Sequence, residues 1–258
     1  MTPLELYRAG ELREAIKALG EELRKTPLDA RRRTFLFELL CFAGEYDRAE
    51  KHLDVLAGQS PKDAAGMMLY RSAIHAERTR QGMFARGETP AVEDAQPIGG
   101  QWNGKPFAEM SDADPRIGPN LEVFIAGSYT WIPMIYLRGL EVEPPANLRD
   151  LIWARARVEA SPEFRLQELG EVLLPVLSPL SWSYADAAVQ LGRETAWEED
   201  PAHGQIPYGA KMMAIDGVDV PLLELRSVEW TPAGAEASGA EDSTAEESGV
   251  KESDDASA

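Results

Sequence analysis

Residues 6–30 read LYRAGELREAIKALGEELRKTPLDA, and residues 40–64 repeat this pattern 34 positions later. The matched positions include a glycine, an alanine five residues after it and a proline near the end of each copy. A unit of this length cannot bury its apolar face alone, so neighbouring units stack and share a core. The first third of the chain is therefore expected to form stacked pairs of helices.

This period and this placement of Gly, Ala and Pro are typical of tetratricopeptide repeats. Such repeats leave a concave face that binds a segment of another protein, which favours an adaptor over an enzyme. Helices are predicted at about 3–9, 11–25, 27–42, 46–57 and 61–86.

Local signals mark the ends of these helices. Thr2, Thr26 and Ser60 each precede a proline and can cap a helix start. Gly10 and Gly44 are expected to end the first and third helices in the left-handed conformation. About two repeats and a closing helix fall short of the roughly three units that a solenoid needs, so we expect support from the C-terminal half.

The pattern changes after residues 87–100, which are rich in Gly and Pro and are interpreted as a linker. Strands are expected at 121–125, 131–137 (an edge or a bend, because it contains Pro133) and 171–177, with a hairpin or two adjacent strands in 211–228. Residues 184–191 suggest a helix, and 148–158 fit a strand or a helix. The predicted class is α+β with a mainly antiparallel sheet, divided into a helical domain (1–86), the linker, an α+β domain (101–230) and a disordered acidic tail (231–258).

Charge excludes several classes of partner. The net charge is −18, and residues 87–232 alone carry 23 acidic and 10 basic residues. Nucleic acids and anionic membrane surfaces require a concentrated basic surface, which argues against both. The basic run at 31–33 is expected to be a solvated helix face. No apolar run reaches about 18 residues and no signal peptide is evident, which predicts a cytoplasmic protein without membrane insertion.

Catalytic and metal-binding motifs are absent from the sequence. The three histidines have no partner at metal-ligand spacing, and Cys41, the only cysteine, is expected to be a buried thiol. Ser128 follows Gly127 without the second glycine of a nucleophile elbow. We expect no metal, no cofactor and no enzymatic activity. Asp112 and Asp114 could bind a cation or act as paired carboxylates, but a capped turn before Pro115 is favoured.

Several strings carry a family resemblance. They lie at 70–87 (with Glu77, Arg80 and Phe84), 112–122, 127–133, 148–153, and 195–197 with 222–226. Together with the repeats, they resemble the ImpE/TagJ (SciE-like) accessory proteins of bacterial type VI secretion. The residues that the resemblance marks are Asp112, Asp114, Tyr129, Trp131, Pro133, Asp150, Trp153, Trp197 and Arg226. Residues 203–209 depart from the Gly-rich, Arg-containing turn expected of the family, so no role is implied for that loop.

The resemblance implies a cytoplasmic accessory protein that binds the N-terminal helix of the small contractile-sheath subunit. Such binding would modulate sheath assembly or recycling by the ATP-driven unfoldase. A groove between helices can receive an amphipathic helix. The residues expected to face the groove are Arg31, Thr34, Glu38, Cys41, Met68, Ser72 and His75.

Two other functions stay open at this stage. The helical repeats could serve as a general scaffold or co-chaperone for another protein. An enzyme would require one pocket that joins Asp112, Asp114, Asp150 and Arg226. The sequence leaves the oligomeric state open.

Overall fold

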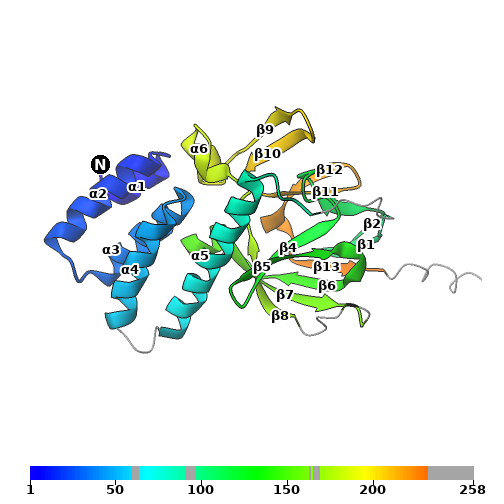
Figure 1. Ribbon diagram of the computed structural model, residues 1–258, viewed down its shortest axis with the longest axis horizontal. Helices are drawn as coiled ribbons and strands as arrows, with labels where there is room; N and C mark the ends of the chain where they lie inside the picture. Colours follow the sequence, from blue (N-terminus) through cyan, green and yellow to red (C-terminus); the bar gives the residue numbers. More distant parts are fainter. Residues whose placement is uncertain (60–63, 91–96, 163, 165–168, 232–258) are drawn as a thin grey trace, which may run out of the picture.

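Helices make up the N-terminal part of the computed structural model, which describes residues 1–59, 64–90, 97–162, 164 and 169–231 (Figure 1). They are α1 (Pro3–Arg8), α2 (Leu12–Lys25), α3 (Ala30–Phe42), α4 (Tyr46–Gln59) and α5 (Ala64–Ala85). Consecutive helices pack against one another from α1 to α5. None of the helices in the described ranges combines the length and the apolar composition that a membrane span requires.

The helix ends follow the expected signals with one correction. Thr2 caps α1, and Gly10 and Gly44 have φ angles of +86° and +69°. The start of the third helix was predicted wrongly, because Asp29 rather than Thr26 caps α3. The Thr26 hydroxyl instead donates to the carbonyl of Glu22 in the preceding helix. The expected cap at Ser60 lies outside the described residues.

Small residues let the helices approach closely. Ala15 and Ala49, the equivalent positions of the two repeats, are both fully buried. Leu19 and Leu53 are likewise equivalent and are at most 2% exposed. The apolar face of each helix thus forms one shared core, as the helical periodicity predicts.

The C-terminal part is built on antiparallel strands. Within the described residues, the largest sheet has eight strands in the order β2-β1-β13-β6-β7-β8-β4-β5. Its strands are β1 (Gly100–Trp102), β2 (Lys105–Phe107), β4 (Asn120–Ile125), β5 (Ser128–Pro133), β6 (Leu137–Val142), β7 (Trp153–Ala160), β8 (Gly170–Pro175) and β13 (Ser227–Trp230). The α+β class with a mainly antiparallel sheet is confirmed.

Two smaller sheets flank the large one. The first is a two-stranded ribbon of β9 (Thr195–Asp200) and β10 (Gly204–Gly209). The second contains β3 (Met110–Asp112), β11 (Met212–Ile215) and β12 (Val218–Pro221), in the order β12-β11-β3. Short helical segments join the strands: η2 (Met134–Tyr136), η3 (Leu148–Leu151), η4 (Ser181–Ser183), α6 (Ala187–Gln190) and η5 (Leu222–Glu224).

The segments whose type the sequence left open each combine a strand with a short helical segment. β5 is the last strand of the large sheet and ends at Pro133, so both expectations for 131–137, an edge and a bend, apply. Residues 148–158 begin as η3 and continue as β7. The expected strand at 221–228 is instead η5 followed by β13, and β13 joins the large sheet. Residues 231–258 were expected to be disordered; from 232 onward they lie outside the described residues.

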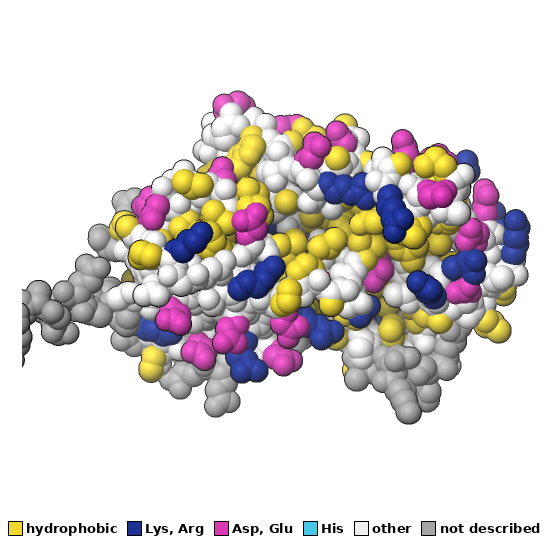
Figure 2. Space-filling model, turned by 180° about the vertical axis from the view of Figure 1, so that it is seen from behind, with side chains coloured by type: hydrophobic (Ala, Val, Ile, Leu, Met, Phe, Trp, Pro, Cys, Tyr) yellow, Lys and Arg dark blue, Asp and Glu magenta, His cyan; other side chains and the backbone are white. Residues whose placement is uncertain are grey.

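The two parts share a hydrophobic core at their junction. The helical core includes Phe124 of β4, Trp153 of β7 and Leu173 of β8. α5 lies between the other helices and the sheet and contacts β5 (Figure 1). Hydrophobic side chains also form a band across the rear face, from the sheet to the helices (Figure 2). The helical part therefore rests on the C-terminal part, as its small number of repeats suggests.

Candidate functional site

A buried network of charged side chains crosses the junction. Arg80 of α5 is fully buried, and its Nε and Nη2 donate to the two carboxylate oxygens of Glu122, at 2.7 and 2.9 Å. Its Nη1 donates to Glu77, one turn earlier on α5, at 3.0 Å. The bidentate geometry gives Arg80 a fixed orientation between α5 and β4.

Lys211 extends the network into the small sheet. Its Nζ lies 2.6 Å from Glu122 Oε2 and also pairs with Asp112 of β3. Burial would raise the pKa of Glu122, but Arg80 and Lys211 hold that pKa well below its ordinary value. Burial raises the pKa of Asp112 to about 7, against the opposing effect of Lys211. The network is thus held together by opposite charges that have no access to water.

Aromatic side chains complete the hydrogen bonds of these carboxylates. The Tyr129 hydroxyl donates to Glu122, and Trp131 Nε1 donates to the Tyr129 oxygen at 2.5 Å. Trp153 Nε1 donates to Glu77 Oε2 at 2.9 Å. Three aromatic residues marked by the sequence therefore converge on one buried cluster.

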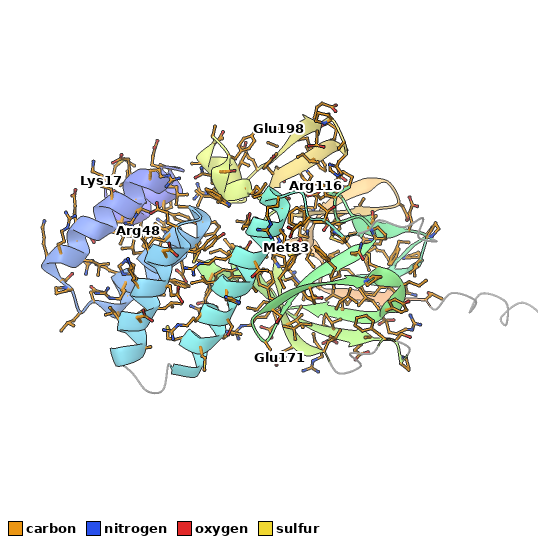
Figure 3. The ribbon with its side chains drawn as sticks, in the orientation of Figure 1. Lys17, Arg48, Met83, Arg116, Glu171 and Glu198 are labelled. Carbon is orange, nitrogen blue, oxygen red and sulfur yellow. The ribbon has the colours of Figure 1, made fainter. Side chains whose placement is uncertain are left out.

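Asp112 and Asp114 form a turn, as favoured from the sequence. Asp112 Oδ1 accepts the backbone N–H of Asp114 at 2.9 Å, and Asp114 accepts the backbone N–H of Arg116 at 3.0 Å. The Arg116 guanidinium also binds Asp114 and lies 5.1 Å from the ring centroid of Phe84, near the C-terminal end of α5 (Figure 3). No group of three or more His, Cys, Asp or Glu side chains suited to a metal occurs among the described residues.

The predicted groove on α3 is closed by the chain itself. Glu38 was expected to face a partner, but it is 6% exposed and pairs with Arg149 of η3 at 3.6 Å. The Arg149 guanidinium also lies 4.9 Å from the ring centroid of Tyr70. Cys41 is buried beside them, as a structural thiol would be. This corrects the expectation for Glu38 and Cys41, because the C-terminal half occupies the face where a foreign helix was expected.

The remaining predicted groove residues are accessible to different degrees. Arg31 is exposed, and the Thr34 hydroxyl donates to the Ala30 carbonyl. Met68 is 71% exposed. Ser72 and His75 line a hollow of about 460 Å³ that also includes the β4–β5 turn.

A larger opening, the junction groove, lies between the N-terminal end of α5 and the sheet and has a volume of about 510 Å³. Its apolar lining includes Leu69 of α5, which is 41% exposed, with Phe124 and Leu173 below. Its charged lining includes Arg157 of β7, which lies directly across from Glu141 of β6 and Glu171 of β8. Figure 3 labels Glu171 on the sheet side of the junction. An apolar floor beside a row of charges is suited to a polypeptide with one apolar face.

Comparison with known proteins places the chain in a family. The family model described as ImpE protein matches residues 104–229. The type VI secretion system accessory component TagJ of Pseudomonas aeruginosa is 33% identical over 267 aligned residues, covering 90% of this chain and 92% of that protein. The chain belongs to the ImpE/TagJ family. The resemblance recognised from its sequence strings is confirmed.

A similar fold is also known from a crystal structure. A protein of Vibrio parahaemolyticus matches with a TM-score of 0.78 and 21% sequence identity, covering 89% of this chain and 97% of that one. At this identity the comparison shows the fold alone.

The other residues that the family resemblance marks lie apart from the buried network. Asp150 accepts the backbone N–H groups of Ala146 and Asn147 at the start of η3. Arg226 is exposed and donates to the Leu225 carbonyl. No described hydrogen bond or ion pair joins Asp150 or Arg226 to Asp112 or Asp114, so the arrangement that an enzyme would require is not observed among these side chains.

The sequence did not predict the buried charged network at the junction of the helices and the sheet. Glu77, Arg80 and Glu122 lie within the strings of the resemblance, but their pairing is not evident from the sequence, and Lys211 lies outside those strings. A usable signal existed. Glu122 is the lone charge in the apolar strand LEVFI, and Lys211 directly precedes the apolar MMAI. Charged residues in such positions are buried only when they are paired.

Proposed function

We propose that this chain is a non-catalytic adaptor of the type VI secretion system that binds the N-terminal helix of the small sheath subunit in the cytoplasm. Its relationship to the accessory component TagJ supports the system. The repeat period of the sequence supports a tetratricopeptide-like helical domain at 1–86, with 87–100 as a linker to the α+β domain. The adaptor would modulate sheath assembly or recycling by the ATP-driven unfoldase.

The observation that carries this proposal is the junction groove. Leu69, Phe124 and Leu173 offer an apolar floor to the apolar face of an amphipathic helix. Arg155 and Arg157 alternate with buried residues along β7, so both side chains lie on the groove side of the sheet. Acidic groups at Glu141 and Glu171 flank Arg157 on the two neighbouring strands. Both signs of charge are available to the polar face of a docked helix.

The proposed groove differs from the one expected from the repeats alone. The C-terminal half covers Glu38, whereas Met68 and Leu69 at the start of α5 remain accessible. The docking surface is therefore shared between α5 and the sheet. A partner helix would contact both halves of the protein at once.

Isothermal titration calorimetry of the full chain with a peptide from the sheath subunit's N-terminus tests the proposal. Micromolar affinity corresponds to about −8 kcal/mol. Leu69→Glu places a charge in the groove and should weaken binding about tenfold or more. Leu4→Glu is the matched control, because Leu4 is a helical leucine of similar exposure, 45%, on α1.

The possible outcomes test separately whether the chain binds the sheath peptide and whether it does so in the junction groove. Absence of binding by the unaltered chain contradicts the sheath-adaptor function. Equal binding by the chain and by Leu69→Glu retains the function but rejects the groove. Equal affinity for an unrelated amphipathic peptide of the same length and charge would favour the general scaffold instead.

A further inference from the structure

A second opening, the ribbon cleft, lies between the β9–β10 ribbon and the small sheet. Its volume is about 780 Å³. Trp197, Gln205 and His203 line it from the ribbon, and Ser111, Ala214 and Asp219 line it from the small sheet. Figure 1 shows the ribbon extending away from the large sheet, on the side of β11 and β12. The ribbon cleft is therefore separate from the junction groove in position and in lining residues.

Trp197 is the unusual residue of this cleft. It is 37% exposed, whereas the other five tryptophans are buried or half-buried. Within the described residues, no aromatic ring and no Lys or Arg side chain packs on its indole ring. Trp102 provides a contrast, because Lys105 Nζ lies 5.1 Å from its ring centroid. An accessible indole in a cleft is the type of side chain that dominates binding at protein interfaces.

The charges around Trp197 are negative. Glu199 lies across from Gln205 on the ribbon and accepts a hydrogen bond from its side chain. Asp219 is exposed on the opposite wall. His203 pairs with Asp200, at 2.8 Å. The cleft thus combines an aromatic face with carboxylates, which together attract a cation.

The basic side chains nearby do not neutralise these carboxylates. Arg116 is 7% exposed and pairs with Asp114. Lys211 is 3% exposed and pairs with Asp112 and Glu122. Because both cations are paired with buried carboxylates, they do not neutralise the exposed carboxylates of the cleft, which can still attract a further cation.

We propose that the ribbon cleft is a second binding site, which takes an extended, arginine-bearing segment of a protein partner with the guanidinium against Trp197. Arginine fits better than lysine because its planar group stacks on an aromatic ring and also donates to carboxylates. An extended segment fits because strands wall the cleft on both sides, and Ser111, Ala214 and Asp219 are cross-strand neighbours on one face of the small sheet. With two sites, the adaptor can hold two partner segments at once.

Fluorescence anisotropy of the full chain tests the site. The probe is a labelled nine-residue Gly/Ser peptide with two arginines separated by one residue, compared with the same peptide containing citrulline. Citrulline preserves the shape and removes the charge. We expect the arginine peptide to bind, and Trp197→Ala to weaken binding about tenfold. Trp197→Phe should give an intermediate affinity, and Asp219→Asn should weaken binding about threefold.

Matched controls separate the cleft from general attraction to an acidic protein. Trp102→Ala removes a tryptophan that is already covered by Lys105, and Glu21→Gln removes one exposed charge from α2. Both should bind the arginine peptide like the unaltered chain. Equal affinity of all variants, equal affinity for the citrulline peptide, or absence of binding overturns the proposal. Thermal melting of Trp197→Phe and Asp219→Asn verifies that the variants fold.

Discussion

Arg80 of α5 and Glu122 of β4 form a bidentate ion pair in which neither side chain is more than 1% exposed. The two residues are 42 positions apart, and they join the helical part to the sheet. Because both charges lack water, each depends on the other for its hydrogen bonds. The relative position of the two parts is therefore tied to this pair and to the Lys211 and Glu77 side chains beside it.

Replacing Glu122 with glutamine should destabilise the protein strongly. The substitution preserves shape but removes the carboxylate that Arg80 and Lys211 both bind. Breaking a buried pair costs about 3–5 kcal/mol. Urea unfolding measures the loss. Glu171→Gln, a glutamate at the exposed end of β8, is the control and should change stability by about 0.5 kcal/mol or less. Equal effects of the two variants would contradict a structural role for the network.

The Arg80 and Glu122 substitutions should be non-additive. Arg80→Met alone leaves Glu122 with Lys211 as its remaining cationic partner, whereas the double variant Arg80→Met, Glu122→Gln removes both members of the pair. Residues within one ion-pair network show coupling energies of about 0.5–3 kcal/mol. We expect the double variant to lose less stability than the two single variants together. Additive losses in urea unfolding would show that the pair contributes no mutual stabilisation.

Glu38 should make stability depend on pH. Burial raises its pKa from 4.5 to about 7, although Arg149 opposes the shift. As the pH rises, Glu38 therefore loses its proton in the unfolded chain at a lower pH than in the folded protein. Its contribution to stability is complete below pH 4.5 and is lost as the pH rises toward 7. The Glu38→Gln side chain does not titrate. In this variant the free energy of unfolding should therefore decline less between pH 5 and 7, by up to about 3 kcal/mol.

The exposed control Glu21→Gln should leave the slope of stability against pH unchanged. The raised pKa of Asp112 acts in the same direction and remains in the Glu38 variant, so part of the decline should persist. The lowered pKa of Glu122 acts in the opposite direction. Its contribution to stability is present above pH 4.5 and is lost only as the pH falls below that value. A Glu38→Gln profile identical to that of the unaltered chain would exclude Glu38 as a titrating group.

The two repeat glycines should differ in their tolerance of alanine. Both have positive φ angles, which alanine adopts only with strain of about 1 kcal/mol. A Cβ at Gly44 would lie 2.6 Å from the Trp182 ring, whereas a Cβ at Gly10 would have its nearest neighbour, Arg193 Nη1, at 3.9 Å. Thermal unfolding should show Gly44→Ala losing about 1–3 kcal/mol more than Gly10→Ala. Equal losses would mean that Trp182 moves away freely.

Local patterns predicted the helices well because helix signals are short-range. Thr2, Gly10 and Gly44 act through backbone groups within four residues, so their roles can be inferred without the rest of the chain. The start of α3 was misplaced because Thr26 and Asp29 are both capable caps, and only one position can be used. Strand order was not predictable, since β13 lies between β1 and β6, far from both in sequence.

The sequence by itself determined the 34-residue repeat, the class of the fold and the family, because periodicity and motif spacing are properties of neighbouring residues. Tertiary structure alone decided that Glu38 is closed off by Arg149, and that Glu77, Arg80, Glu122 and Lys211 meet. The physical reason is desolvation. Whether a charged side chain is paired in a dry interior or left in water depends on residues brought close by folding, and no local pattern records them.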